Sequence, residues 1–244
     1  MTHPPIESYD ELDSTNAEAR RRAEDGRSGP LWITALTQTA GRGRRGRAWE
    51  TTKGNLAATL LFTTRKPPAE AAQVSFVAAM AAAGLADHHL EPGLARLKWP
   101  NDLLIDGRKA AGILVESGTR PDGALWLAVG IGVNLAHAPG DVDRPAVAFS
   151  EVMATPPPPR EALEILATQF EHWRAIWETQ GFAPIAAAWT ARAHGLGGLC
   201  EARLPNQTYR GIAEGLDMDG ALRLRLADGS ILRITAGDVF FGGS

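Results

Sequence analysis

The chain has 244 residues, a formal net charge of -3, 44% hydrophobic and 22% charged residues, as in a soluble globular protein with one large core and one small satellite domain. The charge balance excludes the strongly basic domain of a dedicated DNA-binding protein, and the single cysteine, Cys200, excludes an intramolecular disulfide and a cysteine-based zinc site. Residues 1–5 lack the charged and apolar regions of a signal peptide, and no uninterrupted apolar run has the length of a membrane span, so we expect a cytoplasmic protein.

The first half of the chain predicts two helices and a series of strands. Thr15 and Glu18 have capping-box spacing, which predicts a short helix from Thr15 to Gly26. The alanine-rich segment 70–90 lacks proline and predicts a buried helix. Apolar runs bounded by turn residues predict strands over 31–36, 55–63, 95–99, 103–105, 109–116 and 125–135.

The second half predicts helices followed by a small all-β unit. A proline-rich connector at 155–159 leads into an amphipathic helix over 160–179, and a second helix covers 184–193. Beyond residue 198, short strands alternate with turns, which predicts a small β-barrel of roughly fifty residues. These strands cover 200–204, 207–216, 221–226 and 231–234.

The segment 41–47, which we call the arginine loop, alternates glycines with arginines and precedes Ala48-Trp49. Glycine permits close backbone approach, and the planar guanidinium of arginine matches carboxylate and phosphate. We expect a mobile loop that closes on an anion. On this segment alone, a lid over a small phosphorylated ligand is about as well supported as the simpler alternatives, a nucleic-acid-binding loop or a solvated basic turn. Gly130 and Gly132 interrupt the strand over 125–135 and imply a close neighbour, either a ligand or another backbone.

Four segments together resemble the biotin protein ligases, which activate biotin with ATP and attach it to a carrier lysine. The segments are Ser14-Thr15-Asn16, Gln38 with the arginine loop, Lys98-Trp99-Pro100-Asn101-Asp102 with Lys109-Ala110-Ala111-Gly112, and Gly130-Ile131-Gly132-Val133-Asn134. The resemblance runs from Ser14 to the C-terminal barrel, and the combination of motifs is specific although each alone is weak.

The resemblance implies a two-domain fold and indicates which further domain to expect or not. It implies a mixed α/β sheet with helices, similar to class II aminoacyl-tRNA synthetases, over residues 1–194, followed by an SH3-like barrel over 195–244. Some family members carry an N-terminal winged-helix domain that makes them repressors. Only about a dozen residues precede Ser14, so we expect no repressor activity and no nucleic-acid partner.

The implied reaction needs positive charge more than covalent catalysis, because a carboxylate must attack the α-phosphate of ATP. Arg42 and Arg44 suit bidentate contact with the biotin carboxylate and the phosphate, and Lys109 can bridge the two anions. A surface lysine in a hairpin is the less favoured alternative for Lys109. The predicted catalytic residues are Lys109, Arg44 and Asp102; Asp102 orients or deprotonates the carrier lysine, unless it only forms a turn.

Neutral donors and acceptors are predicted to hold the ureido ring of biotin. The predicted biotin residues are Ser14, Thr15, Asn16, Gln38, Arg42, Gly43, Arg44, Lys109 and Gly112. The predicted ATP residues are Arg45, Arg47, Trp49, Lys98, Asn101 and Asn134. Trp49 either stacks on adenine or anchors the core. No carboxylate cluster of the metal-site type is present, so Mg²⁺ is expected to arrive on the ATP phosphates.

Two other functions compete with biotin ligation. A lipoate or octanoate ligase on the same fold needs a different glycine-rich signature followed by a His-Asp pair, which this chain lacks. A nucleic-acid-binding module would combine the arginine loop with the barrel, but the barrel has few aromatic residues for base stacking. We therefore expect a biotin carboxyl carrier protein as the partner and no membrane association, with a monomer and a homodimer both open.

Overall fold

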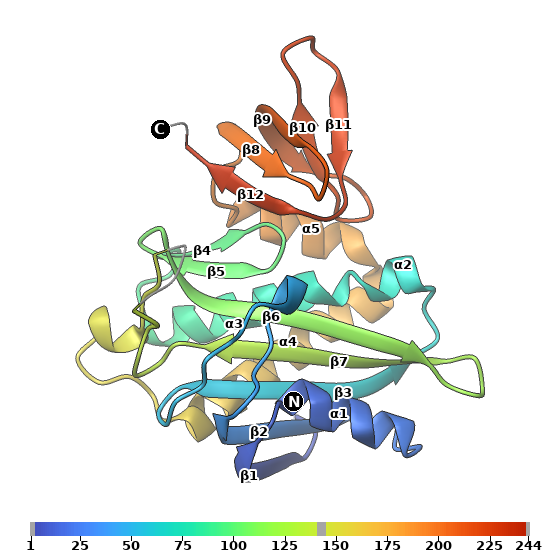
Figure 1. Cartoon of the computed structure of the whole chain (residues 1–244), viewed down its shortest axis with the longest axis vertical. Helices are drawn as coiled ribbons and strands as arrows, with labels where there is room; N and C mark the ends of the chain where they lie inside the picture. The colour runs from blue at the N-terminus through green and yellow to red at the C-terminus, as the bar shows by residue number, and fades with distance from the viewer. Residues whose placement is uncertain (1–2, 141–144, 243–244) are drawn as a thin grey trace.

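A seven-stranded mixed sheet organises the larger part of the protein (Figure 1). The computed structural model describes residues 3–140 and 145–242, so residues 1 and 2 of the N-terminal segment discussed above lie outside the described residues. The strand order is β1-β2-β3-β7-β6-β5-β4, in which β1 and β2 are parallel and the other neighbours are antiparallel. The strands are β1 (Ile6–Leu12), β2 (Leu31–Gln38), β3 (Leu56–Thr64), β4 (Ala95–Lys98), β5 (Asp102–Ile105), β6 (Arg108–Thr119) and β7 (Leu125–Val133).

Helices cover both faces of this sheet, which explains why β3 and β7 are apolar along nearly their whole length. The helices are α1 (Thr15–Glu24), α2 (Pro68–Ala71), α3 (Val74–His89), α4 (Pro159–Gln180) and α5 (Phe182–Ala191). On one face, α3 and α4 pack against the main core, which includes Leu60 and Phe62. On the other face, α1 packs a smaller cluster with Leu61 and Trp126 (Figure 1).

The single helix predicted over 70–90 is two helices, α2 and α3, separated at Ala72 and Gln73. The Gln73 side chain accepts a hydrogen bond from the Trp177 indole N–H at 3.1 Å, which fixes the break against α4. By length and hydropathy, Pro68–His89 is a candidate membrane span with a mean hydropathy of 1.4, but 72% of its apolar window is buried inside the fold. The segment thus belongs to the core of the fold.

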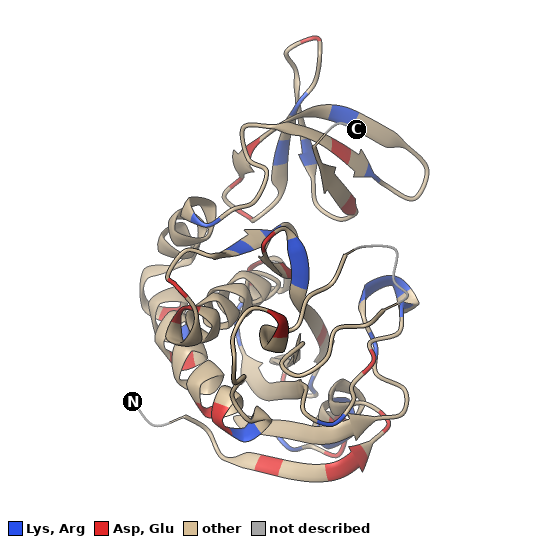
Figure 2. Cartoon of the chain, turned by 90° about the vertical axis from the view of Figure 1, so that its left-hand side faces the viewer, with Lys and Arg blue, Asp and Glu red and all other residues tan. Residues whose placement is uncertain are grey.

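A second, antiparallel sheet, which we call the C-terminal sheet, stands at the β4–β5 end of the larger part (Figure 1). Figure 2 shows it as a separate layer above the larger part. Its order is β11-β10-β9-β8-β12. Its strands are β8 (Leu199–Arg203), β9 (Thr208–Leu216), β10 (Leu222–Arg225), β11 (Ile231–Ile234) and β12 (Asp238–Phe241). The Trp99 indole N–H donates to the Gly220 carbonyl at 3.0 Å and joins this sheet to the end of β4.

Most predicted elements are present, with corrections at both ends of the chain. The predicted N-terminal capping box is wrong, because Ser14 is the N-cap of α1 and its hydroxyl accepts from the Ala17 N–H at 3.4 Å. The Glu18 carboxylate is bound by Arg21 and Arg22 instead of the cap. Sequence reasoning missed β1, an edge strand with polar residues, and β12, which has only four residues. The mixed α/β fold is confirmed; the synthetase-like and SH3-like labels stay predictions.

Candidate active site

A cavity of about 440 Å³ lies where α1, the arginine loop, β6 and β7 meet. It collects all of the predicted site residues except Arg45 and Lys98. The predicted residues that line it are Ser14, Thr15, Asn16, Gln38, Arg42, Gly43, Arg44, Arg47, Trp49, Asn101, Asp102, Lys109, Gly112 and Asn134. Segments more than a hundred residues apart in sequence therefore converge on one site.

At one end of the cavity, buried polar groups form a network around Gln38. Its side-chain oxygen accepts hydrogen bonds from the Thr15 backbone N–H at 2.8 Å and from the Thr15 hydroxyl at 3.1 Å. Its amide nitrogen donates to the Thr51 hydroxyl at 2.9 Å. These bonds fix the orientation of the Gln38 amide, so the site presents a defined set of donors and acceptors.

Asn16 extends this network to β6. Its amide nitrogen donates to Glu116 at 2.8 Å, and its oxygen accepts from the Thr59 hydroxyl at 2.7 Å. A Cβ atom at Gly130 would lie 2.1 Å from the Asn16 Oδ1, so only glycine leaves room for this side chain. The nearest neighbour of Gly130 in the structure is hence the Asn16 side chain, which the sequence prediction of a ligand or a backbone did not include, and Gly130 also lines the cavity.

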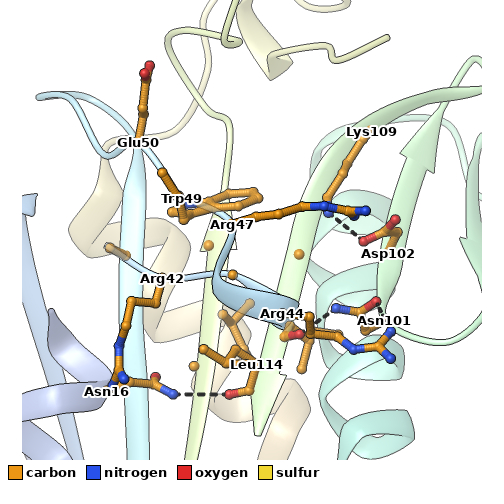
Figure 3. A pocket seen from close by; sticks show the side chains of 18 of the residues that line it. Asn16, Arg42, Arg44, Arg47, Trp49, Glu50, Asn101, Asp102, Lys109 and Leu114 are labelled. Carbon is orange, nitrogen blue, oxygen red and sulfur yellow. Dashed lines mark hydrogen bonds and ion pairs between the residues drawn. The ribbon is translucent and has the colours of Figure 1, made fainter. Parts of the chain in front are cut away.

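Trp49 covers the second strand glycine. A Cβ atom at Gly132 would lie 2.3 Å from the indole ring, and one at Gly112 would lie 3.0 Å from it. The ring is half-buried in the cavity wall and is not part of the buried core, so the core-anchor alternative for Trp49 is wrong. Figure 3 shows the indole beside Lys109, whose Nζ is 5.5 Å from the ring centroid.

Lys109 and Asp102 form an ion pair inside the cavity, with Nζ and Oδ1 2.6 Å apart (Figure 3). The Asp102 side chain is only 6% exposed and that of Lys109 28% exposed. The two residues come from neighbouring strands, β5 and β6. Asn134, at the end of β7, donates from its amide to the backbone carbonyls of Lys109 and Val147, both at 3.3 Å. The Lys109 side chain is therefore held by Asp102 and its backbone carbonyl by Asn134, whose amide nitrogen is used in backbone hydrogen bonds.

The arginine loop is a closed turn over the cavity. The Trp49 N–H donates to the Gly41 carbonyl at 2.9 Å, and the Gly43 N–H donates to the Arg47 carbonyl at 2.7 Å. Its tip is a short 3-10 turn, η1 (Arg44–Gly46), in which Arg45 has a φ of 58°. The left-handed backbone at a non-glycine residue makes this tip a strained local conformation.

Side chains elsewhere in the fold bind all four loop arginines, so the protein itself supplies partners for these guanidinium groups. Arg42 pairs with Glu116 at 3.2 Å. Arg44 donates to the Asn101 side-chain oxygen at 3.2 Å, and burial lowers the pKa of its guanidinium. The remaining two, Arg45 and Arg47, both pair with Asp238 at the start of β12.

Two predicted ATP residues do not line the cavity. The Lys98 Nζ lies 5.7 Å from the Phe240 ring centroid, at the junction with the C-terminal sheet. Arg45 points to Asp238 from the tip of the loop. Conversely, sequence reasoning missed Asp238 and Glu116 as site residues. Asp238 lies in no motif, and Glu116 follows the Lys109–Gly112 motif without a predicted role, so each meets the arginine loop only through the fold.

The described residues, 3–140 and 145–242, contain no group of three or more His, Cys, Asp or Glu residues that could hold a metal ion. The cavity instead concentrates positive charge from Lys109 and the loop, next to a polar network that is neutral except for Glu116. This arrangement can bind an anion at one end and an uncharged polar group at the other, and it can stabilise negative charge that develops between them.

The sequence comparisons identify the family. The model described as "Biotin/lipoate A/B protein ligase family" matches residues 11–134, and the model described as "Biotin protein ligase C terminal domain" matches residues 196–242. The chain therefore belongs to the biotin/lipoate A/B protein ligase family and, within it, to the biotin protein ligases, which are enzymes.

Individual relatives agree with this assignment. A biotin–[acetyl-CoA-carboxylase] ligase of Paracoccus denitrificans is 49% identical over 95% of this chain and 98% of its own length. The bifunctional ligase/repressor BirA of Bacillus subtilis is 31% identical over 96% of this chain and 73% of its own length. The solved structure of a biotin protein ligase from Aquifex aeolicus in complex with biotin and ATP has a TM-score of 0.84 at 23% identity, covering 98% of this chain and 99% of that one. At that identity the structure supports the fold.

Proposed function

We propose that this enzyme activates biotin with ATP to biotinyl-5'-AMP and transfers the biotin to a lysine of a biotin carboxyl carrier protein. The observation that carries the proposal is the Lys109–Asp102 ion pair of 2.6 Å, which lies in one cavity with the arginine loop and the Gln38 network. The names of the relatives support biotin and ATP as substrates and a carboxylase subunit as the acceptor.

In the first half-reaction, a biotin carboxylate oxygen bonds to the α-phosphorus of ATP while the bond to pyrophosphate breaks. Both reactants are anions, so positive charge held in place lowers the barrier. We assign Arg42, Arg44 and Lys109 to the carboxylate and α-phosphate. Ser14, Thr15, Asn16 and Gln38 are assigned to the ureido ring, because a pre-formed hydrogen-bonding network discriminates against acids that lack the ring.

In the second half-reaction, a carrier lysine amine attacks the biotinyl carbonyl, and AMP leaves. Asp102 is assigned to orient or deprotonate this amine. Lys109 pairs with Asp102, so this assignment requires the lysine to shift towards the adenylate before the carboxylate is available to the amine.

Binding of the nucleotide is assigned to Arg45, Arg47, Trp49, Asn101 and Asn134, and to Lys98, which lies outside the cavity lining. Of the carboxylates that line the cavity, Asp102 and Asp238 are ion-paired and Glu50 is exposed, which does not suit a dedicated metal site. Mg²⁺ is therefore assigned to the ATP phosphates.

We further propose residues 1–194 as the catalytic domain and 195–244 as an SH3-like domain, in a cytoplasmic enzyme without repressor activity.

The test is to incubate the protein with ATP, Mg²⁺ and biotin, and separately with lipoate or octanoate, and to detect acyl-adenylates by mass spectrometry. Biotinyl-adenylate from the first mixture alone is the expected result. An adenylate of lipoate or octanoate without one of biotin would contradict the proposal. Addition of a carrier domain, with and without its acceptor lysine, tests the transfer step.

A further inference from the structure

Asp238 of the C-terminal sheet reaches into the site of the larger part. Its Oδ2 is 3.0 Å from Arg45 Nη1 and 2.7 Å from Arg47 Nη2, and its Oδ1 is 3.5 Å from Arg47 Nη1. The Asp238 side chain is 13% exposed and lines the cavity, although it lies 191 residues from Arg47 in sequence. One carboxylate thus holds two guanidinium groups of the loop.

We propose that Asp238 is a positioning residue of the ligand site. It serves as a counter-anion that holds Arg45 and Arg47 in the empty enzyme, and the phosphates of the nucleotide take these arginines from it. The identity of the nucleotide rests on the proposed function. The exchange itself requires only an anion with more charge than one carboxylate.

The charges around the loop favour such an exchange. Arg42 has its own carboxylate, Glu116, and Arg44 donates to a neutral amide, so Asp238 serves the other two arginines of the loop. A triphosphate offers several charged oxygens in a geometry that guanidinium forks match. While the Asp238 carboxylate lines the cavity, it also repels incoming phosphates. Its charge therefore weakens nucleotide binding, and before the nucleotide binds it holds the arginine loop in place.

The test is the variant Asp238→Asn, which keeps the shape of the side chain and removes its charge. We expect the KM for ATP to fall about threefold to fivefold, as for loss of a partly exposed ion pair, and the KM for biotin to stay within about twofold. Without any ligand, trypsin should cut after Arg45 and Arg47 faster than in the wild type, because these arginines are no longer held.

Two matched variants separate charge from structure. Asp219→Asn removes a carboxylate from the turn between β9 and β10, where it binds Arg233 at 2.5 Å, and it should leave both KM values and loop cleavage unchanged. Asp238→Glu keeps the charge and should behave as the wild type. If Asp238→Asn does not fold, as judged by its thermal unfolding midpoint, Asp238→Ser makes the same prediction.

An unchanged KM for ATP with unchanged loop cleavage in Asp238→Asn overturns the proposal. A raised KM for ATP overturns it as well, since the carboxylate then supports nucleotide binding instead of competing with it. The proposed function fails separately, if the wild type makes no biotinyl-adenylate. The ligand-free cleavage comparison still tests the role of Asp238 in that case.

Discussion

Lys109 makes two different contacts in this site, because its ammonium group lies between the Asp102 carboxylate and the Trp49 ring. Lys109→Ala is expected to lower adenylate formation by roughly 10² to 10³, which corresponds to about 2–4 kcal/mol of barrier. Pyrophosphate release in the presence of biotin measures this rate.

A matched control is available one residue away. Arg108 pairs with Glu151 outside the cavity, and Arg108→Ala should leave pyrophosphate release unchanged. Because Lys109→Ala removes the partner of the buried Asp102, its unfolding midpoint must be measured in parallel. A folded Lys109→Ala enzyme with near-normal pyrophosphate release would remove Lys109 from the mechanism.

The strand glycines make a graded prediction. Gly132→Ala puts a Cβ atom 2.3 Å from the Trp49 ring and must displace it, whereas Gly112→Ala puts one at 3.0 Å and needs a smaller shift. Overpacking of this kind costs about 1–3 kcal/mol, so we expect adenylate formation to fall about tenfold or more in Gly132→Ala and less in Gly112→Ala. Equal, wild-type rates in both would show that the position of Trp49 does not matter.

At the residue scale, the sequence predicts groups that sit in short motifs and misses groups that arrive through folding. Lys109 and Asp102 were predicted as separate motif residues, and the structure pairs them. Asp238 and Glu116 were missed for different reasons: Asp238 lies in an ordinary short strand, whereas Glu116 lies near the Lys109 motif but gains its role only from the arginine it meets. Which carboxylates pair with the loop arginines therefore becomes visible only in the folded structure.

At the scale of elements, periodicity and turn residues located the buried strands and the long helices. Edge elements were harder, because β1 is half solvated and β12 has four residues, so neither gives a strong apolar pattern. The break between α2 and α3 was also hidden, since both helices are alanine-rich and the break depends on the contact of Gln73 with Trp177. Local pattern therefore predicts which segments are buried better than where they end.

The arginine loop is predicted to become more ordered when biotin or its adenylate binds. Its base is closed by backbone hydrogen bonds, but its tip, η1, has none of its three residues buried. A ligand carboxylate and phosphate add partners for the arginines, so binding and ordering are coupled. We expect the backbone amides of η1 to exchange with solvent more slowly when biotin is present, while the Trp49 amide at the base changes little.

Hydrogen exchange with and without biotin measures this difference. The amides of α4, far from the loop in sequence and part of the core, serve as the internal reference. If the η1 amides exchange equally fast in both states, the loop is not a lid, and the assignment of its arginines to the carboxylate and phosphate must be withdrawn.

At the scale of the whole molecule, the junction of the two sheets includes a histidine that favours its neutral form. The His194 ring packs edge-on to Phe241 of β12 at 5.8 Å, and burial, with Lys98 and Arg96 nearby, lowers its pKa. As pH falls through the unfolded-state pKa of about 6.5, the unfolded chain binds a proton that the folded chain does not. Stability should therefore fall below about pH 6.5.

His194→Gln removes this contribution, so its free energy of unfolding should depend less on pH between about 5 and 7 than that of the wild type. Urea unfolding at four pH values measures the slope. His89 also has a pKa lowered by burial and keeps part of the dependence in both proteins. An identical slope in His194→Gln and the wild type would contradict a neutral histidine at the junction.

The C-terminal sheet is predicted to be required for turnover and not only for stability. Truncation after Gly195 removes β8 to β12, the sheet that contributes Asp238 to the cavity lining, while the Gln38 network and Lys109 remain. Loss of the Asp238 charge alone is expected to tighten ATP binding, so we attribute the lost turnover to the opened cavity, where water reaches the acyl-adenylate. We therefore expect a folded truncation to retain biotin binding and to lose most of its ATP-dependent turnover.

Because truncation also exposes Trp99, which the C-terminal sheet covers in the intact protein, Trp99→Phe is a milder variant for comparison. It removes the hydrogen bond to Gly220 together with part of a buried ring, and should cost about 1–3 kcal/mol of stability. Biotin binding by calorimetry and carrier biotinylation, measured on both variants, separate the two roles; a truncation with unchanged turnover would show that the sheet is dispensable.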